Sequence, residues 1–271
     1  MKPLHEWSPE HPIDGLLTDI DDTLTTDGRL GADAYAALES LQAAGLRVVP
    51  VTGRPAGWCD HIARMWPVDA VVGENGAFYM HYDSVSRRLR TVHGTDAATR
   101  ERQRRRLRRI AGEVLAAVPG CALASDQPWR EADLAIDWCE DVARLPDAQV
   151  DRIAALMRAR GLTVKVSSIH VNGWFGGHDK LSMTRRALAD LWGVDLDRDR
   201  ARWVFAGDSP NDAPMFAYFP DSVGVANVRD FARRLDALPT WVTTARSGAG
   251  FVELARHLLG RAAGAGPASR G

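Results

Sequence analysis

Four aspartates stand in two short runs of this 271-residue chain, at spacings that could do chemistry. Asp19 and Asp21 are two positions apart in TDIDDT, and Asp208 and Asp212 are four apart in GDSPND. Carboxylates held together repel one another unless a cation or a proton lies between them. Because carboxylate oxygens are the ligands that Mg²⁺ prefers, the two runs together predict a magnesium site. Taken alone, D-I-D-D-T would fit a solvated acidic turn equally well.

One lysine stands out because the chain uses arginine almost throughout. Lys2, Lys165 and Lys180 are the only lysines among 34 basic residues. Lys180 lies in HDKLSM at the expected start of a helix, where a cation is mildly unfavourable without a partner. An ammonium group binds phosphate as a point charge and neutralises carboxylates beside it. We therefore favour a functional role for Lys180 over that of a surface lysine.

The polar groups follow predicted strands. Asp19 lies near the end of a largely apolar strand at 15–20 and Asp21 follows it. Thr52 follows a strand at 46–51, and Asp208 follows the strand RWVFA. Strands that alternate with helices at this spacing indicate βαβ units around a parallel sheet. Ligands of such a sheet bind beyond the carboxyl ends of its strands, so we expect these side chains to meet in one crevice.

The regular alternation of strands and helices is interrupted in the middle of the chain and then continues. We expect a discontinuous core at 1–81 and 178–271, an inserted α/β unit at 82–177, and a disordered tail at 261–271. Core helices are expected at 33–44, 55–66, 180–192 and 251–259, with further strands at 69–72 and 222–226. The insertion is expected to hold helices at 95–118 and 146–160, strands at 132–138 and 162–171, and a hinge at 172–177.

Composition limits the partners. A net charge of −1 argues against a general polyanion binder, so no nucleic-acid partner is expected. The arginine run at 100–109 is interpreted as a solvated helix face. No leader or membrane segment is evident and the three cysteines form no zinc pattern, so a cytoplasmic protein is expected.

The runs TDIDDTLT, VTGR at 51–54, Lys180 and GDSPND at 207–212 together resemble the four ordered motifs of the haloacid dehalogenase-like (HAD) phosphohydrolases. ENGA at 74–77 and the place of the insertion resemble the subgroup with a large α/β cap, which includes the Cof-like and sucrose-phosphate phosphatases. The resemblance implies an α/β fold: a doubly wound, Rossmann-like parallel-sheet core with an inserted α/β cap domain.

The resemblance also implies roles. Asp19 would attack phosphorus to form an aspartyl-phosphate, and Asp21 would protonate the leaving alcohol and then activate water. Thr52 and Lys180 would hold the phosphoryl oxygens. The implied metal ligands are Asp19, Asp21 through its backbone carbonyl, Asp208, and Asp212 through water. The implied substrate-binding residues are Thr52, Gly53, Arg54, Glu74, Asn75, Lys180 and Asn211.

Several alternatives stay open. Glu74 and Asn75 fit a hairpin turn as well as a substrate contact, and Arg54 could instead pair with a carboxylate. The function expected is a Mg²⁺-dependent phosphatase of a small phosphorylated metabolite, with a sugar phosphate as the first choice. A phosphomutase with the same site and a non-catalytic sugar-phosphate sensor are the alternatives, and the sequence leaves the oligomeric state open.

Overall fold

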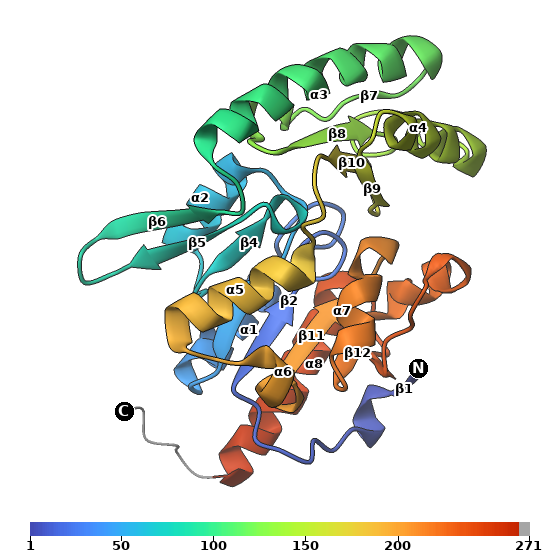
Figure 1. The fold of residues 1–271 in the computed structure, drawn as a ribbon. Helices are drawn as coiled ribbons and strands as arrows, with labels where there is room; N and C mark the ends of the chain where they lie inside the picture. Colours follow the sequence, from blue (N-terminus) through green and yellow to red (C-terminus); the bar gives the residue numbers. More distant parts are fainter. Residues whose placement is uncertain (266–271) are drawn as a thin grey trace.

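A central parallel sheet organises the computed structural model, which describes residues 1–265 and the side chains of residues 1–260. Its spatial order is β1 (Lys2–Pro3), β13 (Trp241–Val242), β12 (Ser222–Gly224), β11 (Trp203–Gly207), β2 (Gly15–Thr18) and β3 (Arg47–Pro50). The chain leaves β2 toward β3 on one side, and β11 adds on the other (Figure 1). This makes the carboxyl end of β2 a topological switch point, where ligands of α/β sheets bind.

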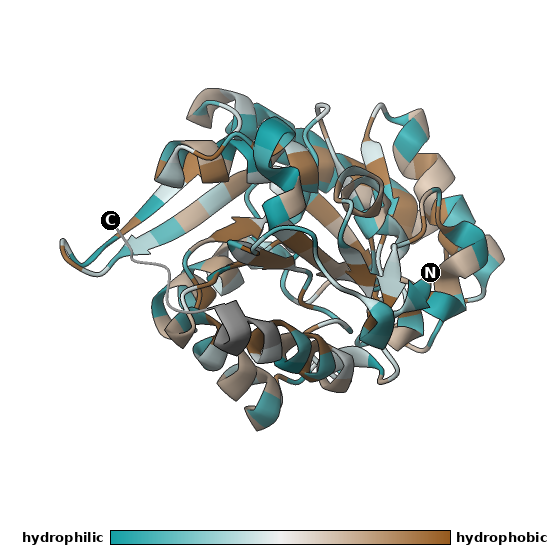
Figure 2. Ribbon diagram, turned by 90° about the horizontal axis from the view of Figure 1, so that it is seen from below, coloured by the Kyte–Doolittle hydropathy of each residue, from teal (hydrophilic) through white to brown (hydrophobic). Residues whose placement is uncertain are grey.

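Alternating side chains of the buried strands point to the two faces of the sheet. On β2, Leu16 packs with α1 (Ala32–Ala43) and α8 (Ser247–Ala265), whereas Leu17 packs with the helices of the other face. The remaining helices of this part are α2 (Ala56–Met65), α5 (Lys180–Trp192), α6 (Leu196–Asp199) and α7 (Ala213–Tyr218). Figure 2 shows the result, with hydrophobic strands inside and mixed or hydrophilic surfaces on the helices around them.

Two antiparallel sheets add to the parallel one. The first holds β4 (Val71–Gly73), β5 (Phe78–Asp83) and β6 (Arg88–His93). The second has the order β7 (Ala122–Leu123), β8 (Asp133–Asp137), β10 (His170–Trp174) and β9 (Thr163–Val166). Helices α3 (Ala97–Ala117) and α4 (Asp147–Ala159) share an apolar core with the second sheet, at the top of Figure 1.

The predicted α/β fold class, a parallel-sheet core with an added α/β unit, is confirmed. The single strand predicted at 162–171 is wrong, because the chain forms a β9–β10 hairpin there. Ser167 turns the chain: its backbone N–H donates to the carbonyl of His170 (2.8 Å), and its hydroxyl accepts from the His170 N–H (2.9 Å). The expected hinge at 172–177 accordingly begins inside β10.

The ends of the chain add two observations. Helix α8 continues to Ala265, and the rest of the tail expected at 261–271 lies outside the described residues. Across the described part of the chain, no helix combines the length and the apolar character needed to cross a membrane.

Candidate active site

Lys180 connects the first and last acidic runs of the sequence. Its Nζ lies 2.6 Å from Asp19 Oδ1 and 2.7 Å from Asp212 Oδ1, and all three side chains are buried. Burial opposes the charge on Lys180, but the two carboxylates outweigh it and raise the pKa of the ammonium above its ordinary value. Residues separated by up to 193 positions in sequence therefore meet beyond the carboxyl end of β2.

Two local features place Lys180 at the first position of α5. Asp179 caps the helix, since its side chain accepts from the Ser182 N–H (2.7 Å) while the Ser182 hydroxyl approaches the Asp179 backbone. Gly76 packs against this cap with φ +102°, and a Cβ added there would lie 2.0 Å from the Asp179 carbonyl oxygen. Only glycine fits both the backbone angle and the close approach.

Asp19, Asp208 and Asp212 form a buried cluster in which one carboxylate oxygen from each lies within 4.8 Å of the others. Burial raises the pKa of Asp19 to about 8; Lys180 lowers it, and Asp212 and Asp21 add to the rise. Burial and the neighbouring carboxylates also raise the pKa of Asp208. Three carboxylates against one ammonium leave a negative excess, and a divalent cation would satisfy it.

Each of the other two aspartates in the cluster is held by neighbouring donors. Asp208 Oδ2 accepts from Asn227 Nδ2 (3.0 Å) and Oδ1 from the Thr23 hydroxyl (3.4 Å). Asp212 Oδ2 accepts from the backbone N–H of Asp208 (3.0 Å). Its other oxygen, Oδ1, accepts from Lys180 (2.7 Å), so Asp212 orients the ammonium group of Lys180.

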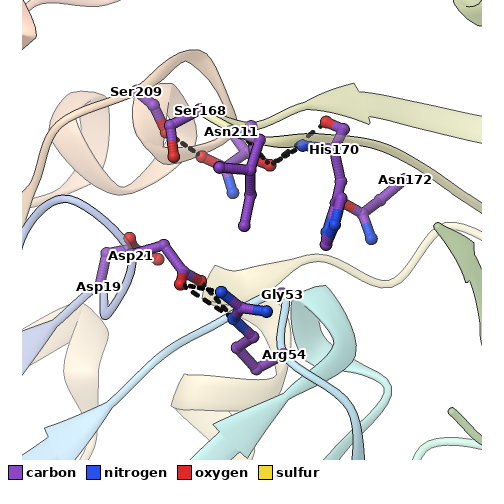
Figure 3. A pocket seen from close by; sticks show the side chains of 11 residues that line it. Asp19, Asp21, Gly53, Arg54, Ser168, His170, Asn172, Ser209 and Asn211 are labelled. Atoms are coloured by element: carbon purple, nitrogen blue, oxygen red, sulfur yellow. Dashed lines mark hydrogen bonds and ion pairs between the residues drawn. The ribbon is translucent and has the colours of Figure 1, made fainter. Parts of the chain in front are cut away.

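Asp21 points toward Arg54, as Figure 3 shows. Arg54 Nε lies 2.9 and 3.0 Å from the two carboxylate oxygens of Asp21, and Nη2 lies 2.7 Å from Oδ1. Nη2 also donates to Glu140 Oε1 (2.7 Å), and Nη1 to Asp126 Oδ2 (3.4 Å). Burial would lower the pKa of Arg54, but the carboxylates of Asp21 and Glu140 raise it. The side chain of Arg54 is thus shared among three carboxylates.

The loop after β3 carries Thr52, Gly53 and Arg54. The hydroxyl of Thr52 accepts from the Arg54 backbone N–H (3.0 Å), and the Thr52 carbonyl accepts from the Asn75 N–H (3.0 Å). Asn75 Nδ2 is buried and has no hydrogen-bond partner in the described part of the chain. A Cβ at Gly53 would lie 3.2 Å from that nitrogen. The loop and the 74–76 turn are therefore one packed unit.

Glu74 is fully buried and binds four backbone amides. Its Oε1 accepts from the N–H groups of Ala56 (3.0 Å) and Glu131 (2.8 Å), and Oε2 from those of Ala132 (2.6 Å) and Asp133 (3.2 Å). The segment also turns the chain between β4 and β5, which is the hairpin turn that the sequence left open beside a substrate contact. Since its oxygens are already occupied, Glu74 holds the second antiparallel sheet unit against α2.

A narrow pocket lies above Asp19 and Asp21 (Figure 3). Its free space is about 10 Å³, roughly what one water molecule needs. The lining residues are Asp19, Asp21, Gly53, Arg54, Ser167, Ser168, Ile169, His170, Asn172, Ser209 and Asn211. Asn211 is held by the hydroxyl of Ser209, which donates to its Oδ1 (2.7 Å).

The pocket also includes residues that the sequence did not single out as site residues. The β9–β10 turn supplies Ser167 and Ser168, and His170 and Asn172 follow on β10. Glu140 lies behind them, with Oε2 2.9 Å from His170 Nε2. Ser167 and Ser168 belong to no local motif, and the strand predicted at 162–171 concealed the turn, so no sequence signal marked them. His170 and Asn172 are polar residues at the end of that predicted strand, where a cap could present them to a leaving group, but the sequence offered no further reason to choose them.

Known proteins resemble this chain in sequence and in fold. The family model of the haloacid dehalogenase-like hydrolases matches residues 16–90. A phosphoglycolate phosphatase of Haloarcula marismortui is 29% identical over 242 residues, which are 88% of this chain and 94% of the relative.

Two solved structures share the fold over nearly their whole length. The Thermoplasma acidophilum 0175 protein has a TM-score of 0.66 at 20% identity, over 92% of this chain and 99% of that one. The sucrose-phosphatase of Synechocystis sp. PCC6803 has a TM-score of 0.61 at 15% identity, over 91% and 98%. The sequence match across the first two motifs, the curated relative and the shared fold all agree with the resemblance to haloacid dehalogenase-like phosphatases that the four sequence motifs indicate.

Proposed function

We propose that the chain is a Mg²⁺-dependent phosphohydrolase that acts through an aspartyl-phosphate on a small phosphorylated metabolite. The contact of Lys180 with both Asp19 and Asp212 carries this proposal. The groups needed for the reaction thus lie at one point. Asp19 is the nucleophile, Lys180 supplies a positive charge for the phosphoryl group, and the excess of buried carboxylates would bind a metal ion.

The reaction follows from these positions. A carboxylate oxygen of Asp19 attacks phosphorus, so that an O–P bond forms while the bond from phosphorus to the ester oxygen breaks. Asp21 gives its proton to the departing alkoxide and then takes one from the water that hydrolyses the acyl phosphate. Lys180 and the hydroxyl of Thr52 would hold the phosphoryl oxygens, whose negative charge they complement in the transition state.

The buried carboxylates fit the magnesium ion that the sequence predicts. Asp19 and Asp208 would hold it with the backbone carbonyl of Asp21, and Asp212 would support it through water. When bound, the ion neutralises charge on the phosphoryl group and keeps Asp19 ionised.

The pocket must open before an ester can enter, because its free space matches about one water molecule. Asp21 is bound to Arg54 in this closed arrangement and must leave that partner to reach the ester oxygen. We propose that the insertion predicted at 82–177 acts as a cap through its second antiparallel sheet with α3 and α4, since residue 82 itself lies inside β5. This cap would move to admit the ester, and its closure would then exclude bulk water from the reaction.

The substrate class expected from the sequence is a sugar phosphate. The Haloarcula relative is named for phosphoglycolate and the Synechocystis neighbour for sucrose phosphate. Both are phosphate esters of small hydroxylated molecules, which fits a pocket whose lining includes serines, a histidine and two asparagines.

Phosphate release from a panel of sugar phosphates, phosphoglycolate and nucleotides, with and without Mg²⁺, tests the proposal. We expect Asp19→Asn to abolish release while the protein stays folded, because an amide cannot form the acyl phosphate. Undiminished turnover in Asp19→Asn would refute the mechanism. Isomerised sugar phosphate in place of free phosphate would identify a mutase, and binding without consumption a sensor.

A further inference from the structure

Lys165 lies beside the pocket, although the mechanism above makes no use of it. It is on β9, directly opposite Asn172 of β10 in the antiparallel register. Residues opposite each other in such a pair place their side chains on the same face of the sheet. Asn172 lines the pocket, so Lys165 is on the pocket-facing side of the sheet.

The surroundings of β9 support this placement. Ser167 and Ser168, just beyond the end of β9, line the pocket. The strand also packs against the turn Pro210–Asp212, which carries the lining residue Asn211. In Figure 1, β9 points toward the helices of the parallel-sheet part. The flexible four-carbon side chain of Lys165 therefore starts between two groups of lining residues.

Other cations around the pocket are already neutralised. Arg54 contacts three carboxylates, and Lys180 contacts two. Arg130 pairs with Asp126 (2.9 Å) and Asp133 (2.9 Å). Lys165, in contrast, forms no ion pair with any of residues 1–260, although it is partly buried.

A partly buried ammonium without an ion-pair partner leaves its positive charge available to an incoming anion. We propose that Lys165 binds a negatively charged group on the leaving-group half of the substrate. The substrate is then the phosphate ester of a small hydroxy acid, with a carboxylate at the cap and a phosphoryl group at Asp19. This inference rests on the proposed phosphatase function and narrows its substrate class from neutral sugars to acids.

A matched pair of esters tests the inference. Phosphoglycolate and 2-hydroxyethyl phosphate have the same length and differ in a carboxylate against a neutral CH₂OH group. We expect the unaltered enzyme to prefer phosphoglycolate in kcat/KM by about 10- to 100-fold, the range expected for a charged hydrogen bond. Lys165→Gln should raise KM for phosphoglycolate by a similar factor, with little change in kcat and a much smaller effect on the neutral ester.

Two variants serve as controls. Lys165→Arg keeps the charge and should restore part of the preference, whereas Arg158→Gln, on the exposed end of α4, should leave both esters unaffected. Equal losses on the two esters in Lys165→Gln would assign the lysine to protecting the edge of the sheet. That result, or an unaltered enzyme without a preference, overturns the inference.

Binding separates this inference from the proposed function. Calorimetry of Asp19→Asn with each ester measures affinity without turnover. Tighter binding of phosphoglycolate that Lys165→Gln removes supports the inference even if no phosphate is released, and equal binding of both esters overturns it.

Discussion

Lys180 decides the charge balance of the site. Two of the three buried carboxylates in the Asp19 cluster bind its ammonium directly, and removal of one partner from a buried ion pair costs about 3–5 kcal/mol. The same residue would hold the phosphoryl group, so a change here affects stability and catalysis together.

We expect Lys180→Met to lower the free energy of unfolding by about that amount and to abolish phosphate release. Because the variant leaves three carboxylates without a cation, Mg²⁺ should raise its melting temperature more than that of the unaltered protein. Thermal unfolding with and without Mg²⁺ measures both effects. Equal Mg²⁺ stabilisation of the two proteins would contradict a metal at this cluster.

Among the connecting elements, the 74–76 turn does most to position the site. It joins β4 to β5, binds the loop after β3 and packs on the start of α5. A side chain at Gly76 would meet the Asp179 carbonyl, so the turn and α5 would have to separate.

We expect Gly76→Ala to destabilise the protein by at least about 1 kcal/mol, since it combines a strained φ with a backbone clash. It should also reduce turnover, because Asp179 is adjacent to Lys180. Gly112→Ala is the matched control: it lies inside α3 with no atom within 4 Å of an added Cβ, and alanine should stabilise it slightly. Chemical denaturation of both variants, with activity beside it, measures the difference.

At the scale of the whole molecule, charged side chains connect the parallel-sheet part to the second antiparallel sheet around the pocket. Arg54 from the loop after β3 binds Glu140, which follows β8 in the second antiparallel unit. Burial opposes the charge on Glu140, but the close contact with His170 and the charge of Arg54 outweigh it and lower its pKa to about 2.

Stability should therefore depend on pH through Glu140. Its folded pKa lies below the unfolded value of 4.5, so its contribution is complete above pH 4.5 and is lost as pH falls toward 2. We expect Glu140 to contribute up to about 3 kcal/mol to the free energy of unfolding. Glu140→Gln should remove this part of the dependence of stability on pH. Denaturation measured between pH 2 and 6 checks this prediction. Glu113→Gln, which removes one partner of an exposed ion pair, is the control, and it should leave the dependence of stability on pH unchanged.

The sequence by itself determined the elements and the chemical parts. Apolar runs predicted β2 and β11, the alternation of strands and helices predicted α1 and α5, and residue types predicted the carboxylates with Lys180 as their cation. The elements and the chemical groups can be predicted locally, because the burial pattern, the backbone preference and the charge of a segment depend on its own residues.

Only the tertiary structure decided which distant groups share a partner. Asp21 and Glu140 share Arg54 as their ion-pair partner, and Glu74 binds backbone amides at the start of β8. The β9–β10 turn brought Ser168 to the pocket where one strand was predicted. Such pairings depend on packing between segments far apart in the chain, and their energies are not encoded in the periodicity of either segment.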